Sequence, residues 1–195
     1  METEAPQAPP HAALGHPPGA ALWVFAYGSL MWRPGFPVAE RHPALVHGWH
    51  RSFCLYSWRH RGTPERPGAV LGLDRGGACR GIAYRVPDEA TEETLAYLWD
   101  REMVNYVYRP RRLTARLAGG RTETALAFVV DPRSRQYCGR LPPDALAALI
   151  RQGEGQSGRA LDYFLDLLAH LRALGIRDHG LEALRTVVAP PGGGR

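Results

Sequence analysis

Two features of this sequence could do chemistry, a glycine-opened loop near the start and an acidic residue far downstream of it. The loop lies in FAYGSLMWRPGF at positions 25–36, where an apolar strand is expected to end and Gly28 lets the backbone turn with its N–H groups uncovered. The acidic residue, Glu102, falls on the apolar side of an expected helix. A donor-rich loop and a buried carboxylate can together support acyl transfer without an enzyme nucleophile. The sequence therefore predicts an enzyme.

Glu102 continues an apolar face of the expected helix, following at helical spacing Leu95, Leu98 and Trp99. Burial would raise the pKa of this carboxylate above about 4.3, and the nearby helix C-terminus would act in the same direction. A carboxylate tuned in this way suits general base catalysis. The pattern leaves two alternatives open: a buried ion pair with Arg101, Arg109 or another arginine, or an exposed side chain at a frayed helix end.

The loop offers donors rather than a nucleophile. Backbone N–H groups around Gly28, Ser29 and Leu30 can converge on an anion, and the Ser29 hydroxyl adds one more donor. Ser29 lacks the glycine-flanked turn of hydrolase nucleophiles and a convincingly placed histidine base. The alternative is an ordinary strand-ending turn in which Trp32 fills core space.

Two further segments carry candidate contacts. Tyr137, in RQYCGRL, follows the last expected strand and could bring a phenol to the same end of the sheet, or it could be an ordinary core or surface tyrosine. Arg59, His60 and Arg61 form a cationic turn suited to a substrate carboxylate, although a solvated loop also fits the pattern.

Motifs for metals, phosphates and disulfides are missing from the sequence. The eight histidines show no metal-binding spacing, and no glycine-rich phosphate loop is present, so neither a metal nor a cofactor is expected. The three cysteines, Cys54, Cys79 and Cys138, have no CxxC spacing, which favours a reducing cytoplasm.

The chain has 195 residues, of which 45% are hydrophobic, and this length and composition indicate one globular domain. All 24 basic residues are arginines and the net charge is +5, which is compatible with an anionic partner but also with GC-rich coding. No apolar run approaches the roughly 18 residues that span a membrane, so a soluble cytoplasmic protein is expected. Residues 1–20 and 189–195 are expected to be disordered tails around a catalytic domain at 21–188.

The hydrophobic pattern predicts an α+β fold, a mainly antiparallel sheet or small barrel flanked by helices. The strands are expected at 21–27, 44–57, 69–74, 79–86, 106–117 and 122–130, with an RGGA turn at 75–78. Helices are expected at 88–103, 142–152 and 159–174, and Asp88 or Thr91 is the expected N-cap of the first. The last helix is expected to bury a stripe of Leu161, Leu165, Leu168 and Leu171 and to end at Gly175.

Several separated motifs resemble the ChaC-type γ-glutamylcyclotransferases, in the right order and from Leu22 to Val187. They are YGSLMWRPGF, RSFCLYSWRHRGTPERPGAVLGLDRGGACRGIAYRV, YLWDREM, QYCGRL and the long C-terminal helix. The resemblance implies an α+β fold around a closed or nearly closed sheet and cleavage of glutathione to 5-oxoproline and cysteinylglycine.

The resemblance also implies roles for individual residues. Glu102 falls on the general acid/base of that family, and Tyr137 falls on a further substrate contact. The γ-glutamyl group would be held by the loop residues Tyr27, Gly28, Ser29, Leu30, Met31 and Trp32. Met31 stands where the family usually has a β-branched residue, and we expect little consequence from it.

Other readings of the sequence remain. A cyclotransferase of the same fold could act on other γ-glutamyl amino acids, amines or conjugates, whereas RHRGTPERPG favours glutathione, with Arg59 and Arg61 near its glycine carboxylate. An inactive scaffold would not need Glu102. A nucleic-acid-binding module would need clustered arginines, and these are dispersed. We therefore expect a small-molecule substrate and neither nucleic acid nor membrane as partner.

Overall fold

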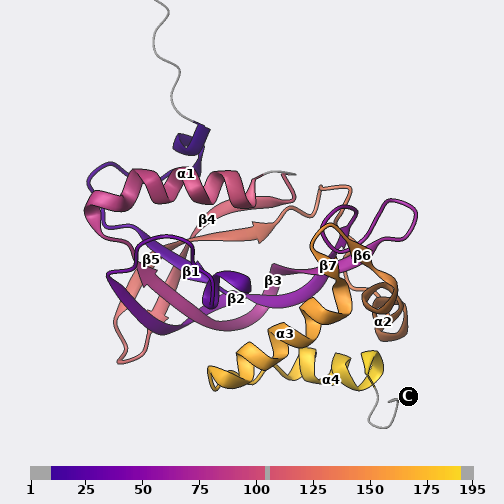
Figure 1. Ribbon diagram of the computed structural model, residues 1–195. Helices are drawn as coiled ribbons and strands as arrows, with labels where there is room; N and C mark the ends of the chain where they lie inside the picture. The colour runs from indigo at the N-terminus through magenta and orange to yellow at the C-terminus, as the bar shows by residue number, and fades with distance from the viewer. Residues whose placement is uncertain (1–9, 104–105, 190–195) are drawn as a thin grey trace, which may run out of the picture.

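Five strands form a closed barrel in the computed structural model, which describes residues 10–103 and 106–189 (Figure 1). The barrel strands are β1 (Trp23–Ala26), β2 (Glu40–Ser57), β3 (Gly68–Arg85), β4 (Tyr108–Leu117) and β5 (Thr122–Val130). Their order around the barrel is β1-β3-β2-β4-β5. All neighbours pair antiparallel except β1 and β5, which close the barrel through the parallel pair Val24 and Leu126. The predicted α+β class and small barrel are confirmed.

Alternate residues of the short strands enter two different hydrophobic clusters. In β1, Val24 and Ala26 belong to the larger cluster, which also receives apolar side chains from the helices, while Trp23 and Phe25 belong to the second. All four residues are buried, so β1 is covered on both faces. This explains why its sequence is continuously apolar rather than alternating.

β3 differs from the prediction of two short strands separated by a turn. It runs without a break from Gly68 to Arg85 and pairs with β2 along its length. At the expected turn, Gly76 and Gly77 have φ of +104° and +66°, and the register with β2 shifts beside Gly48. A β-bulge opposite a glycine therefore replaces the turn, because glycine reaches positive φ without strain.

The helix that carries Glu102 lies over one side of the barrel (Figure 1). A 3₁₀ turn, η3 (Asp88–Ala90), leads into α1 (Thr91–Glu102). Neither Asp88 nor Thr91 is the N-cap; Ala90 is, without a side-chain capping bond. Leu95 and Leu98 are 3% and 0% exposed, so the predicted apolar face is confirmed.

A short helix precedes β1, within the range 1–20 where a disordered tail is expected. Residues 10–14 form the 3₁₀ helix η1 (Pro10–Leu14), and Leu14 is buried in the larger hydrophobic cluster. Residues 1–9 and 190–195, the rest of the two expected tails, lie outside the described residues.

The C-terminal helices lie on the side of the barrel away from α1 (Figure 1). They are α2 (Pro143–Gln152), α3 (Ala160–Ala173) and α4 (His179–Val188), with the short strands β6 (Glu154–Gly155) and β7 (Gly158–Arg159) between the first two. α4 was not expected from the sequence. In α3 the predicted leucine stripe is wrong in part, because Leu165 is exposed and Phe164 and Leu167 are buried instead. Gly175, with φ of +68°, follows the end of α3 as predicted.

None of the helices in the described part of the chain is both long and apolar enough to cross a membrane.

Candidate active site

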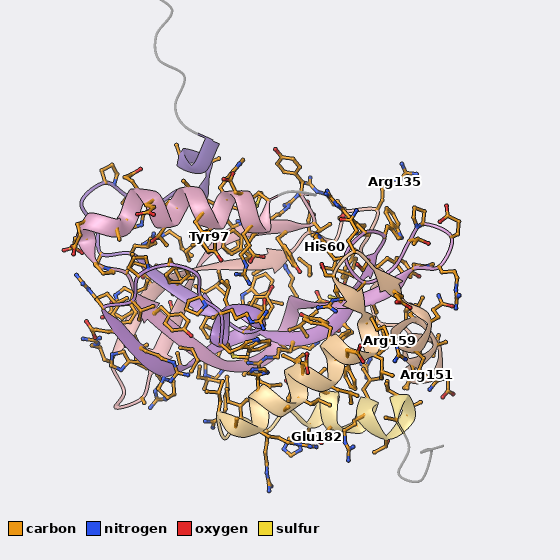
Figure 2. All side chains as sticks on the ribbon, viewed as in Figure 1. His60, Tyr97, Arg135, Arg151, Arg159 and Glu182 are labelled. Carbon is orange, nitrogen blue, oxygen red and sulfur yellow. The ribbon has the colours of Figure 1, made fainter. Side chains whose placement is uncertain are left out.

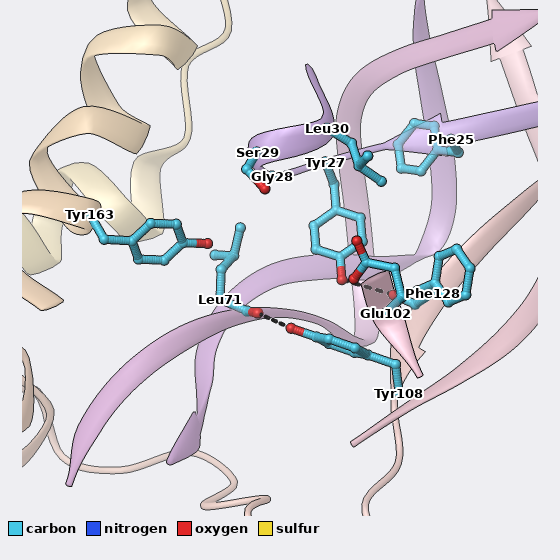
Figure 3. Close-up of a pocket in the computed structure, with 10 residues that line it drawn as sticks. All are labelled: Phe25, Tyr27, Gly28, Ser29, Leu30, Leu71, Glu102, Tyr108, Phe128 and Tyr163. Atoms are coloured by element: carbon cyan, nitrogen blue, oxygen red, sulfur yellow. Dashed lines mark hydrogen bonds between the residues drawn. The ribbon is translucent and has the colours of Figure 1, made fainter. Parts of the chain in front are cut away.

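One cavity gathers the loop after β1 and the last residue of α1 (Figure 3). Of the residues predicted from the sequence, it is lined by Tyr27, Gly28, Ser29, Leu30 and Glu102. The remaining lining residues come from β1, β3, β4, β5 and α3: Phe25, Leu71, Tyr108, Phe128 and Tyr163. The fold therefore brings the two chemically distinctive features of the sequence to the same place.

The loop turns immediately after β1 into a 3₁₀ helix, η2 (Ser29–Met31). The N–H of Met31 donates to the carbonyl of Gly28, and the N–H groups of Trp32 and Arg33 donate to that of Ser29. These bonds fix the turn from within. The N–H groups of Gly28, Ser29 and Leu30 take no part in them, so these are the candidate donors to a bound anion.

Glu102 is largely buried, with 17% of its side chain exposed. Burial raises the pKa of this carboxyl, and the adjacent Arg101 guanidinium, whose Nε lies 3.1 Å from Oε1, acts in the opposite direction without cancelling the rise. The predicted desolvated carboxylate and one of its alternatives, an ion pair with Arg101, are thus both present. Arg109 is not involved, since it pairs with Asp131 at 2.7 Å.

Arg101 also connects the end of α1 to the loop. Its Nη2 donates to Ser29 Oγ at 2.8 Å, and its Nη1 donates to Tyr97 Oη at 2.6 Å and to the carbonyl of Arg33 at 3.2 Å. A planar guanidinium with several fixed partners holds the groups around it in one geometry. Arg101 therefore sets the position of Glu102 relative to the loop.

Two phenols face the carboxylate with their protons already donated elsewhere. Tyr27 Oη donates to the carbonyl of Phe128 at 2.8 Å, and Tyr108 Oη donates to that of Leu71 at 2.9 Å (Figure 3). Burial raises the pKa of both tyrosines well above the usual value, with the Glu102 charge adding to the rise, so they stay neutral. Their oxygens are left to accept, and beside a carboxylate they suit a bound ammonium group.

Tyr163, from α3, completes the aromatic wall of the cavity. Burial raises its pKa to about 12, and the Arg61 guanidinium lies 5.1 Å from its ring centroid. Sequence reasoning missed both Tyr108 and Tyr163. Nothing in the local pattern separates them from other half-buried tyrosines, because what marks them is proximity to Glu102 in the folded chain.

Besides Arg59 and Arg61, three predicted contacts lie outside this cavity. Met31 is 2% exposed and buried in the core, and the Trp32 ring stacks on His170 with centroids 4.1 Å apart. The phenol of Tyr137 donates to Asp74 at 2.9 Å and lines a separate groove beside α2 and α4. Tyr137 lies there because it forms an antiparallel bridge with Leu55, near the end of β2, after the chain leaves β5.

A second cavity adjoins the first and shares Glu102 and Tyr108 with it. Its walls include Arg59 and His60, which are held by the turn between β6 and β7. Arg59 Nε donates to Gln156 Oε1 at 3.0 Å, and His60 Nδ1 lies 3.0 Å from Ser157 Oγ. Arg61 is not in this wall; it stacks on Tyr163.

In the described part of the chain, no group of three or more His, Cys, Asp or Glu side chains could hold a metal ion. The groups that line the site, one carboxylate beside neutral phenols and backbone donors, can support proton transfer.

Comparison with known proteins places this geometry in a family. Residues 22–190 match the ChaC-like protein family. Glutathione-specific γ-glutamylcyclotransferase of Escherichia coli K12 is 39% identical over 168 residues, which cover 86% of this chain and 73% of that protein. Glutathione-specific γ-glutamylcyclotransferase 1 of Homo sapiens is 34% identical over 188 residues, covering 90% and 85%.

A solved structure supports the fold. The crystal structure of a γ-glutamylcyclotransferase specific to glutathione from yeast matches with a TM-score of 0.79 and 24% identity, covering 87% of this chain and 96% of that one. The family match across nearly all described residues, together with relatives at 34–39% identity, shows that this chain belongs to the ChaC-like protein family.

Proposed function

We propose that this chain is a γ-glutamylcyclotransferase that cleaves glutathione to 5-oxoproline and cysteinylglycine. The observation that carries the proposal is the buried carboxylate of Glu102 at the junction of two cavities, with the loop of Gly28 and Ser29 in one and Arg59 in the other. The names of the E. coli and human relatives support glutathione as the substrate.

The reaction needs no enzyme nucleophile. The α-amine of the γ-glutamyl group attacks its own γ-carbonyl carbon, a C–N bond closes the five-membered lactam, and the bond to the cysteine nitrogen breaks. Because both reacting groups belong to one molecule, holding that molecule folded supplies much of the rate, with effective molarities of about 10⁵–10⁸ M for well-oriented pairs.

Glu102 moves the proton. The substrate amine arrives as an ammonium, and the acceptors around it are the Glu102 carboxylate and the phenol oxygens of Tyr27 and Tyr108. With reference pKa values of about 8 and about 4.3, transfer to an ordinary carboxylate is uphill by roughly 5 kcal/mol. Burial of Glu102 narrows this gap. The protonated carboxyl then delivers this proton to the departing nitrogen. The attacking nitrogen loses a second proton as the lactam forms, and the released amine of cysteinylglycine can take up one more, so the whole reaction exchanges no net proton with solvent.

The loop supplies the fixed electrostatics. The N–H groups of Gly28, Ser29 and Leu30 are the donors available for the substrate α-carboxylate and for the oxyanion of the tetrahedral intermediate. Because these donors belong to a turn closed by its own backbone bonds, they need little reorganisation during the reaction.

The second cavity suits the leaving group. With the scissile bond beside Glu102, cysteinylglycine would extend along Trp58 and His60 toward Arg59. An arginine there would recognise the glycine carboxylate, which γ-glutamyl amines and single γ-glutamyl amino acids do not place at that distance. This arrangement favours glutathione over the alternative of other γ-glutamyl substrates on the same fold.

The test is to incubate purified protein with glutathione and to follow 5-oxoproline and cysteinylglycine by mass spectrometry, with γ-glutamylalanine in parallel. We expect both products from glutathione in equal amounts, and a preference for glutathione that falls in Arg59→Gln. Arg135→Gln is the matched control, because Arg135 is exposed and lines neither cavity (Figure 2). If only γ-glutamylalanine is turned over, glutathione is not the substrate and the alternative γ-glutamyl substrates are favoured. If neither compound yields 5-oxoproline, the proposal is refuted.

A further inference from the structure

Arg51 is a buried cation that contacts the loop of residues 27–32. It lies in β2 with 1% of its side chain exposed. An ionised group with so little exposure must be held by several partners, since an unpaired buried charge is strongly destabilising. Its partners therefore indicate what the charge is for.

The guanidinium contacts both ends of the loop. Nε donates to the carbonyl of Tyr27 at 2.6 Å, and Nη2 lies 3.6 Å from Met31 Sδ. Nη2 also donates to the carbonyl of Arg80 on β3, so the loop is attached to the barrel wall through one rigid fork. Between these two attachment points lie the three residues whose N–H groups are the candidate anion donors.

Met31 has a second anchor and a role that the sequence did not indicate. Its carbonyl accepts from Tyr84 Oη at 2.6 Å, which fixes its backbone, while its sulfur faces Arg51. A thioether is a weak acceptor, whereas an aliphatic side chain offers none. The expectation that methionine here has little consequence therefore overlooks this contact.

The fourth partner of Arg51 is Asp178, the N-cap of α4. Asp178 Oδ1 accepts from the N–H of Leu181 at 3.2 Å, and Oδ2 lies 3.5 Å from Arg51 Nη1. One carboxylate thus starts a helix and faces the cation that holds the loop. The position of α4 is coupled to the loop through these two side chains.

We propose that Arg51 is a positioning residue for the γ-glutamyl subsite, with Asp178 orienting its guanidinium. Arg51 bonds to the lining of the Glu102 cavity through the Tyr27 carbonyl, and it acts by fixing where the loop N–H groups point. This inference rests on the proposed function, because its effect is expressed in the binding of the γ-glutamyl group.

The first test is Arg51→Lys. A lysine keeps the charge but cannot span the carbonyls of Tyr27 and Arg80 with a planar fork. Losing a hydrogen bond from a charged donor corresponds to about a tenfold effect or more. We expect the KM for glutathione to rise by about that factor, with kcat per folded molecule changing less. An unchanged KM with a lower Tm would show that Arg51 only stabilises the fold, and would overturn the proposal.

The second test does not depend on altering Arg51. Asp178→Asn keeps an oxygen for the helix cap but removes the charge facing Arg51, and we expect the KM to rise by roughly threefold, as for a weaker contact of this kind. The matched control is Glu182→Gln, also on α4 (Figure 2), which alters an exposed bidentate pair with Arg172 and leaves Asp178 and Arg51 unchanged. The control should leave the KM unchanged. Equal KM values for Asp178→Asn, Glu182→Gln and the native protein would overturn the coupling.

Binding measured without turnover separates this proposal from the proposed function. Calorimetric titration of glutathione into Glu102→Gln protein, with and without Arg51→Lys, should show a higher Kd in the double variant. If the native protein binds no glutathione and forms no 5-oxoproline, the proposed function has failed. If the native protein is active and the two Kd values agree, only the role of Arg51 has failed.

Discussion

Replacing Glu102 with glutamine exchanges one carboxylate oxygen for an amide nitrogen and leaves the shape of the side chain almost unchanged. The amide oxygen can still accept from Arg101 Nε, which lies 3.1 Å from Oε1 in the native protein. What the variant loses is the charge and the ability to take a proton. The two losses have separate, opposite consequences for activity and for stability.

Activity should fall by about 10²–10⁴, the usual contribution of a positioned general acid/base. This corresponds to roughly 3–5 kcal/mol of barrier at about 1.4 kcal/mol per tenfold. This loss is similar in size to the roughly 5 kcal/mol that proton transfer from an ammonium to a carboxylate of ordinary pKa costs, and accepting that proton is the task of Glu102.

The variant should gain stability relative to the native protein as the pH rises. Burial raises the pKa of Glu102 in the folded state, so its contribution to stability is present below the unfolded pKa and is lost as the pH rises through the folded pKa. Glutamine does not titrate. The free energy of unfolding of the variant minus that of the native protein should therefore be larger at pH 8 than at pH 4, growing by at most about 1.4 kcal/mol per pH unit.

Both quantities are measurable on the same preparations. Release of 5-oxoproline gives kcat/KM, and urea unfolding at pH 4 and pH 8 gives the two free energies, with effects of other titrating groups cancelling between variant and native protein. Equal activity would mean that Glu102 is structural. A stability difference that shrinks toward pH 8 would mean that the Arg101 ion pair outweighs burial, and the reasoning on the Glu102 pKa would be wrong.

Three further substitutions test the surroundings of the carboxylate. Gly28→Ala would place a methyl group 3.3 Å from Leu71 Cδ2 in the cavity wall, and its KM for glutathione should rise by about ten- to a hundredfold, as for an overpacked site; an unchanged KM would place the substrate elsewhere. Arg101→Gln removes the cation that lowers the Glu102 pKa, so the acid limb of the pH profile of kcat/KM should move to higher pH, and a shift to lower pH would contradict the assignment. Tyr108→Phe leaves the Leu71 carbonyl without its donor, and urea unfolding should show a loss of about 1–3 kcal/mol together with a lower kcat/KM; a loss of stability alone would remove the phenol from the mechanism.

Local patterns in the sequence were sufficient for much of the fold. The strand at 122–130 has the predicted bounds, and the helix that ends at Glu102 buries the predicted face. These features depend on residues close together in the chain, where the period of apolar side chains reports directly which face is covered. The continuous β3 was missed because a bulge at Gly76 and Gly77 resembles a turn in local composition.

Only part of the candidate site could be predicted from local sequence patterns. The turn at Gly28 and the misplaced carboxylate of Glu102 are visible without a structure, since each breaks a local rule. Tyr108 and Tyr163 break none, and Tyr137 has a plausible position in the chain but lies in another groove.

The sequence by itself determined that a glycine-opened turn follows an apolar strand and that a carboxylate continues the apolar face of a helix, because periodicity defines the face and glycine gives the backbone its freedom. Only the tertiary structure decided that they meet, that two phenols with committed protons face the carboxylate, and that Arg51 and Asp178 join the loop to α4. The physical reason is that periodicity states which side of an element leaves water, whereas the neighbour it then meets is set by barrel closure and strand register between distant parts of the chain.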